Sequence, residues 1–158
     1  DNAVVDSLIL FLSLKKTFVS PTLAAFEMQP DQGDSIEVKG FRNMVKLVGR
    51  AKKGGVRIVV GSHGSVSYAE TGYAYFREME LLQNAGLSTM EIIVAATMEN
   101  ARFFRIDERL GSIEKGKLAD LVFVEGDPLK DIKAMRKVSK VMLNGVWIPS
   151  PRNKAIDF

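Results

Sequence analysis

The 158-residue sequence contains no cysteine, and it contains histidine and tryptophan once each. The absence of cysteine excludes disulfides, thiolate nucleophiles and thiolate metal ligands, and it leaves the redox compartment open. No apolar run reaches the roughly 20 residues that span a bilayer. The first residues, Asp-Asn-Ala, also lack the basic and apolar segments of a secretory signal. We therefore expect a soluble chain with no membrane partner, while its compartment stays unknown.

No strong bias toward one charge sign is present either. The formal net charge is +3 and the isoelectric point is near 9.2, but the basic residues are scattered among acidic ones. The densest basic groups are only Lys15-Lys16 and Arg50 to Lys53. This pattern does not predict nucleic-acid binding, although non-specific polyanion binding would suit the basic isoelectric point. Hydrophobic residues make up 46% of the chain, enough for a folded core.

The first two thirds of the chain predict strands that alternate with helices, as in a parallel sheet. Residues 4–14 are apolar and fit either a helix or a strand, and residues 24–40 are expected to be a loop. Ser88 and Glu91 form the sequence pattern of a helix capping box. The predicted strands are 17–20 and 56–60, and the predicted helices are 41–53, 73–84 and a further one that begins after Ser88.

The last third predicts β structure. Residues 118–124 form an apolar run broken only by Asp120, which predicts a strand buried on both faces and ended by Gly126-Asp127-Pro128. Asn144-Gly145 lies between two apolar segments, 138–143 and 146–148, and is a strong signal for a two-residue hairpin. Residues 149–158 are expected to be a frayed tail.

Four phrases of the sequence, in order, resemble the carboxyl-terminal part of metal-dependent amidohydrolases of the imidazolonepropionase-like and prolidase-like kind. LGSIEKGKLADLVFVEGDPL at 110–129 is similar to the end of that family, and VRIVVGSHG at 56–64 resembles its last barrel strand. AGLSTMEIIVAATMENARFF at 85–104 resembles the helix that follows. SPTL at 20–23 resembles the end of the preceding strand.

This resemblance implies an α/β fold, the carboxyl-terminal part of a TIM-barrel amidohydrolase. Residues 1–107 would supply the last two barrel strands with their helices, and 108–150 the closing strands of a small β-sandwich. Residues 151–158 would be a flexible tail. The chain would then be a piece of something longer, with the first six barrel strands elsewhere.

The same resemblance implies hydrolysis of C–N bonds, in an amide or a peptide, at one or two divalent metals of the zinc type. The family's ligands include several histidines, and a catalytic zinc normally takes three protein ligands. One histidine cannot provide them, so we expect no metal and no activity from this chain alone. His63 stands where the family usually has an aspartate. It could complete an active site with absent sequence, be a non-catalytic remnant, or be a hydrogen-bonded strand-end histidine.

Other polar residues have weaker functional interpretations. Ser62 and Ser65 flank His63 and could contact substrate, although ordinary turn chemistry explains them more simply. Glu78 and Glu80 are expected to be solvated on their helix, and Glu70 to lie in the preceding loop. Asp120 is expected to hydrogen-bond a turn or the backbone rather than to take part in catalysis.

Two functions follow. The first is a segment of a hydrolase that acts on small amides or peptides and depends on a missing amino-terminal half. The second is a stand-alone module that self-associates or binds a partner, because a two-strand slice of a barrel has unpaired edges. A homo-oligomer is therefore expected.

Overall fold

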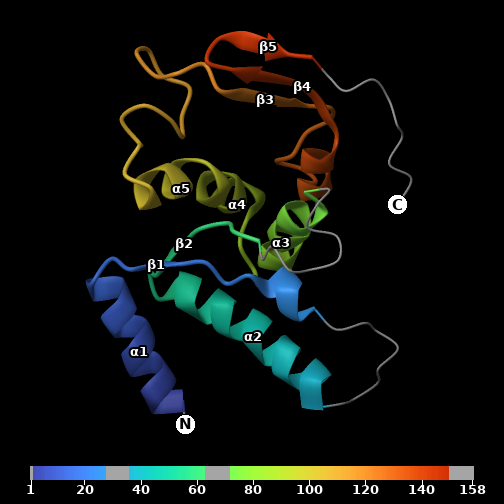
Figure 1. Ribbon diagram of the computed structural model, residues 1–158. Helices are drawn as coiled ribbons and strands as arrows, with labels where there is room; N and C mark the ends of the chain where they lie inside the picture. Colours follow the sequence, from blue (N-terminus) through green and yellow to red (C-terminus); the bar gives the residue numbers. More distant parts are fainter. Residues whose placement is uncertain (1, 28–35, 63–71, 150–158) are drawn as a thin grey trace.

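The computed structural model describes residues 2–27, 36–62 and 72–149 and has a mixed α/β architecture (Figure 1). Its elements divide into two groups that contain one small sheet each. The first group comprises α1 (Asn2–Leu14), β1 (Phe18–Val19), the 3-10 helix η1 (Leu23–Phe26), α2 (Ile36–Lys53), β2 (Arg57–Ile58), α3 (Tyr73–Asn84), α4 (Thr89–Ala96) and α5 (Met98–Phe103). The second comprises β3 (Leu121–Val124), the 3-10 helix η4 (Ile132–Arg136), β4 (Val138–Leu143) and β5 (Val146–Ile148).

The elements form layers that Figure 1 shows from the side. Helices α1 and α2 lie below the short β1–β2 pair, and α4 and α5 lie above it. The antiparallel sheet of β3, β4 and β5 forms the top of the view. Helix α3 contacts η1, α2, α4 and η4, so it joins the parallel pair to the segment that carries the second sheet.

The two predicted strands of the first group pair in parallel, with Phe18 opposite Arg57 and Val19 opposite Ile58. The regular pairing is shorter than the apolar runs that predicted it. The backbone nevertheless stays extended past β2, and Val59 N donates to Val19 O at 3.0 Å. The prediction of a strand–helix–strand unit with parallel strands is therefore confirmed.

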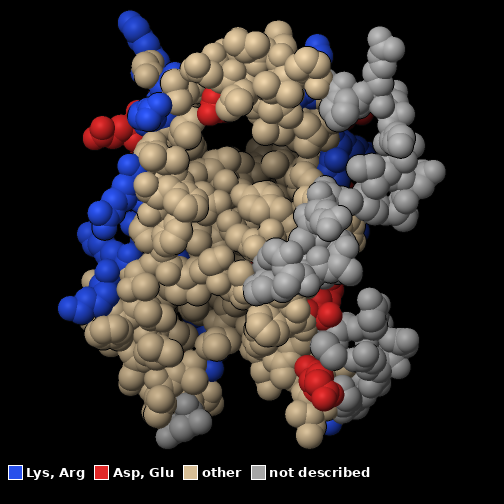
Figure 2. Space-filling model, in the orientation of Figure 1, with Lys and Arg blue, Asp and Glu red and all other residues tan. Residues whose placement is uncertain are grey.

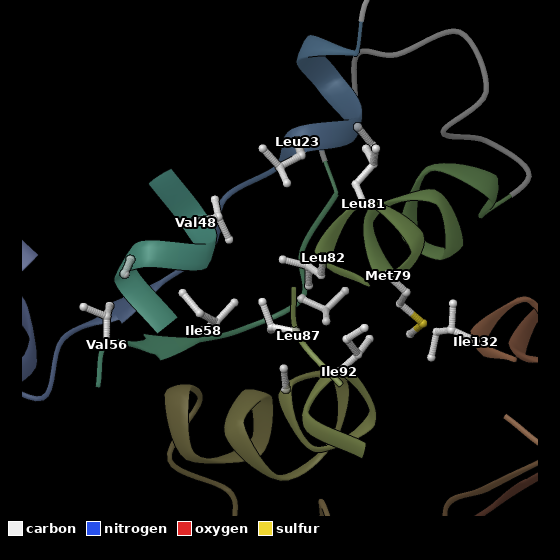
Figure 3. Close-up of a cluster of buried hydrophobic side chains, with 14 of the residues drawn as sticks. Leu23, Val48, Val56, Ile58, Met79, Leu81, Leu82, Leu87, Ile92 and Ile132 are labelled. Carbon is white, nitrogen blue, oxygen red and sulfur yellow. The ribbon is translucent and has the colours of Figure 1, made fainter. Parts of the chain in front are cut away.

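The main core lies between the parallel pair and the surrounding helices (Figure 3). Leu23, Leu82 and Ile92 have no exposed surface, and burial of one such side chain contributes about 1.5–3 kcal/mol. Met79 on α3 extends the cluster toward Ile132 on η4. The core thus binds η4 to the helical layer, although the sequence did not predict this helix.

The expectation of a loop over 24–40 is wrong at both ends. Leu23–Phe26 form η1, in which Leu23 and Ala24 are buried, and α2 begins at Ile36 rather than at Phe41. The acidic side chain of Glu37 in the first turn of α2 and the basic residues in its last turn suit the helix dipole. Residues 28–35 are outside the described part of the chain.

Helix α3 has the predicted bounds, and the capping box of α4 is present. Ser88 Oγ accepts from Glu91 N, and the Glu91 carboxylate accepts from Ser88 N at 2.9 Å. The single helix implied for 85–104 is instead two helices that meet at Thr97, whose φ and ψ are −119° and −85°. Thr97 Oγ1 donates to Ile93 O at 2.7 Å, the side-chain bond to an upstream carbonyl that often bends helices.

The hairpin is confirmed: β4 and β5 are joined by Asn144 and Gly145, whose φ values of 50° and 79° are those of a type I′ turn. Asp120 has the backbone role expected of it, because its Oδ1 accepts from Asn144 N at 2.6 Å. The predicted burial of the 118–124 strand on both faces is wrong. Val122 and Phe123, which point to opposite faces, are 58% and 40% exposed, because the three-stranded sheet has neither face fully covered in the described part of the chain.

Among the described residues, no helix combines the length and apolar character that crossing a bilayer requires.

Two glycines in α2 make matched probes of the helix packing. A Cβ on Gly49 would lie less than 3.0 Å from the backbone oxygen of Ala85, whereas one on Gly40 would meet nothing within 4 Å. We predict that Gly49→Ala lowers the free energy of unfolding by about 1–3 kcal/mol through overpacking. Gly40→Ala should raise it by about 0.5–1 kcal/mol, because alanine loses less entropy in a helix. Urea unfolding measures both, and equal effects of the two substitutions would contradict the close approach of α2 to Ala85.

Candidate functional site

The carboxyl ends of β1 and β2 lie side by side, because the strands are parallel and in register. Ser20 follows β1, and Gly61 and Ser62 follow the extended end of β2. A Cβ placed on Gly61 would lie 2.5 Å from Ser20 Oγ, so the two chain segments touch at this point. Ligand sites of parallel sheets form at this edge, and we call residues 20–22 and 60–62 the strand-end edge.

Of the predicted site residues, Ser62 lies at this edge. Ser62 is exposed there, so its hydroxyl is available to a ligand. His63 and Ser65 lie outside the described residues, and their roles stay predictions. The structure adds Ser20, whose position against Gly61 the sequence reasoning did not identify.

Asn100 on α5 holds the end of β2. Its Nδ2 donates to Val60 O at 2.9 Å and also lies 3.3 Å from the hydroxyl of Tyr75. Val60 N in turn donates to Ala95 O at 3.4 Å. Burial raises the pKa of Tyr75, although its hydrogen bond with Asn100 acts in the opposite direction. Helices α3, α4 and α5 therefore fix the last residues before Gly61.

Glu78 on α3 holds the chain after β1, which corrects the expectation that this side chain is solvated. Glu78 has no exposed surface, and its Oε2 accepts from Ala24 N at 2.7 Å. Burial raises the pKa of Glu78, while the backbone amides of Ala24, Leu23 and Thr22 oppose that rise. The sequence did carry a signal, since Glu78 belongs to the helical stripe of Tyr75, Met79 and Leu82 at i, i+3, i+4 and i+7.

Glu80 is also buried rather than solvated, at 7% exposure. It accepts from Arg136 Nε at 2.7 Å and pairs with Arg77, which in turn pairs with Glu27. Burial alone would raise the pKa of Glu80, but the two guanidinium groups lower it. Arg136 also lies 4.1 Å from the ring centroid of Tyr73. This ion network joins η1, α3 and η4, so Glu80 has a structural explanation.

The described residues do not by themselves fit a catalytic metal. They include no group of three or more histidine, cysteine, aspartate or glutamate side chains that could hold an ion. Of the buried carboxyl groups in the described residues, that of Glu78 accepts from a backbone amide through Oε2 and that of Glu80 pairs with two arginines. Within the described ranges, the candidate site therefore offers hydroxyl groups and backbone groups.

A cavity of about 720 Å³ separates the helices from the second sheet. It is visible in Figure 2 as the hollow between the sheet at the top and the helical layer below it. Apolar side chains form most of its walls, including Phe76, Ile93, Leu121 and Val141. Its walls include Asn100 and Tyr75, which also hold the end of β2, but not Ser62.

Comparison with known proteins assigns the family. The sequence pattern of the amidohydrolase family matches residues 9–148, and the chain belongs to this family. An imidazolonepropionase of Picrophilus torridus is 42% identical over 65 residues, which are 39% of this chain and 16% of that protein.

Solved structures agree. A Xaa-Pro dipeptidase with methionine bound in its active site is 29% identical, with a TM-score of 0.74, over 88% of this chain and 36% of that one. A putative prolidase from Bifidobacterium longum is 32% identical, with a TM-score of 0.72, over 85% of this chain and 36% of that one. The chain thus covers little more than a third of these structures and about a sixth of the curated relative.

A double-mutant cycle tests the strand-end edge. Gly61→Ala should lower the free energy of unfolding by about 1–3 kcal/mol, since its Cβ would clash with Ser20 Oγ. Ser20→Ala removes that oxygen, so Gly61→Ala should have a much smaller effect in the Ser20→Ala background. Denaturant unfolding of the four proteins measures the coupling. Additive effects would show that residues 20 and 61 are not in contact.

Proposed function

We propose that this chain is the carboxyl-terminal part of a metal-dependent hydrolase that acts on C–N bonds in small amides or peptides. The observation that carries the proposal is the strand-end edge. Two parallel strands in register end beside each other at Ser20 and Ser62, and helices hold both strand ends. His63 is the next residue in the sequence. Membership of the amidohydrolase family supports the same reaction class.

The proposed architecture assigns the parallel pair to a barrel and the antiparallel sheet to a sandwich. Residues 1–107 would supply the last two barrel strands with their helices, residues 108–150 the sandwich strands, and 151–158 a tail. A parallel pair flanked by helices, followed by a separate three-stranded antiparallel sheet, supports this division.

The polar groups at the edge, and His63 that follows it in the sequence, each have a limited chemical role in this proposal. The hydroxyls of Ser20 and Ser62 can donate to or accept from a polar substrate group. Neutral or protonated, the His63 imidazole can exchange a proton near neutral pH, but it cannot provide a fixed negative charge. Glu78 is fully buried behind the edge, and its Oε2 is engaged by Ala24. The metal ligands and most of the substrate pocket would therefore come from sequence outside these 158 residues.

The metal proposal predicts that the purified chain binds well under one equivalent of zinc and does not hydrolyse amides. Metal content by plasma emission spectrometry and turnover of an amide panel that includes Xaa-Pro dipeptides provide the measurements. Xaa-Pro dipeptides are included because a Xaa-Pro dipeptidase is among the similar structures. Stoichiometric zinc together with turnover, both lost in His63→Ala, would contradict the dependence on further sequence.

A second proposal is that the chain self-associates through one face of its second sheet. Strand pairing places Val122, Val141 and Ile148 on this face. Six of its described members carry no charge and are 36–66% exposed: Val122, Val138, Val141, Leu143, Val146 and Ile148. Val124 lies on the same face and is half-buried, and Val122, Val138 and Val141 also line the cavity beneath the sheet. A contiguous exposed apolar face of this kind is typical of an interface. The amino-terminal half of the proposed hydrolase or a second copy would cover it.

Adjacent residues of β3 distinguish this face from the opposite one. Sedimentation velocity at micromolar concentration should show an oligomer for the unaltered chain and a monomer for Val122→Lys. Phe123→Lys is the matched control, since Phe123 lies on the other face, and it should leave the oligomer intact. An unaltered chain that sediments as a monomer would rule out self-association.

A further inference from the structure

The buried carboxyl group of Glu78 is tied to the chain immediately after β1. Its Oε2 lies 2.7 Å from Ala24 N, a residue 54 positions away in the sequence. No described group donates to its Oε1. A buried carboxyl group that is only partly hydrogen-bonded lowers stability, so its presence needs a reason beyond core packing.

The turn that Glu78 contacts has no cap of its own. Thr22 adopts the left-handed conformation, with φ 51° and ψ 40°, and its side chain does not cap η1. The next two residues, Leu23 and Ala24, are 0% and 2% exposed, so water cannot readily solvate their amides. Glu78 therefore replaces the missing N-terminal cap of η1 from another helix.

The same turn sets the position of Ser20. Pro21 restricts the backbone between Ser20 and Thr22, so a shift of Thr22 moves Ser20 as well. Ser20 Oγ lies directly against Gly61, the residue before Ser62. A chain of contacts thus leads from the Glu78 carboxyl group through residues 20–24 to the end of β2.

We propose that Glu78 is a positioning residue, which caps the turn after β1 and thereby fixes Ser20 against Gly61 at the strand-end edge. That this edge belongs to a hydrolase active site rests on the proposed function. The positioning of Ser20 by Glu78 does not rest on the proposed function, because it follows from contacts within this chain.

The charged groups around Glu78 leave the contact with the turn as its main polar interaction. Glu27, at the end of η1, adds a negative field that raises the pKa of Glu78 further. Arg77 on the same helix pairs with Glu27 and Glu80, and Arg136 from η4 pairs with Glu80. No described arginine or lysine therefore forms an ion pair with Glu78.

Amide NMR of the whole chain tests the proposal without any need for turnover. In the unaltered protein, the amide proton of Ala24 should titrate with a midpoint above the ordinary glutamate range, because burial raises the pKa of its acceptor. The amides of Gly61 and Ser62 should titrate with the same midpoint, since the turn transmits the change.

Three variants separate positioning from simple stability. Glu78→Ala should shift the amides of Ala24, Gly61 and Ser62 and speed hydrogen exchange at Ala24 by about tenfold or more, the effect of losing a bond to a charged acceptor. Glu78→Gln keeps an acceptor, so it should restore most of these positions while it abolishes the titration. Glu108→Gln, an exposed residue, is the control and should change none of them.

Two results would overturn the proposal. One is an Ala24 amide that does not titrate in the unaltered protein, a measurement that remains valid if Glu78→Ala does not fold. The other is an Ala24 amide that responds while those of Gly61 and Ser62 do not, which would limit Glu78 to capping η1. Stoichiometric zinc and amide turnover by the chain alone would count against the proposed function, and they would leave these readouts unaffected.

Discussion

The geometry of the strand-end edge depends on two polar side chains, the buried Glu78 and the half-buried Asn100, that hold chain segments far away in sequence. Glu78 accepts from Ala24 N after β1, and Asn100 donates to Val60 O at the end of β2. Two strands with so little regular pairing cannot fix their own ends, since a short pair has few ladder hydrogen bonds. The helices supply the missing constraint, because in a low-dielectric interior a hydrogen bond is strong and an unmade one is costly.

The ion network around Glu80 extends this constraint to the second sheet. Glu80 lies between Arg77 and Arg136, and Arg136 belongs to η4, directly before β4. Ile132 adds an apolar contact from η4 to the main core. Helix α3 therefore links both groups of elements, and its burial on nearly all sides follows from that central position. The carboxyl groups of Glu78 and Glu80 on this helix bind other groups of the protein, which favours a role in positioning over direct participation in a reaction.

The second sheet and the cavity beneath it, by contrast, present mainly apolar surfaces. One face of the sheet consists of exposed aliphatic side chains, and three of them, Val122, Val138 and Val141, line the wide and mainly apolar cavity beneath the sheet. The Xaa-Pro dipeptidase and the putative prolidase are nearly three times as long as the region that matches this chain. An apolar sheet face of this kind suits a second sheet packed against it, as in a sandwich. The proposed hydrolase and the proposed oligomer differ in which polypeptide supplies that sheet.

The sequence alone determined the elements that local chemistry controls. The α3 helix, the capping box at Ser88, the Asn144-Gly145 hairpin and the backbone role of Asp120 were predictable, because periodicity and turn chemistry act over a few residues. The family was also recognisable from ordered local phrases. Tertiary structure alone decided the burial of Glu78 and Glu80, the contact between Ser20 and Gly61, and the exposure of Val122. Each of these depends on partners tens of residues away. A carboxylate on a helix is expected to be solvated unless the distant group that binds it is known.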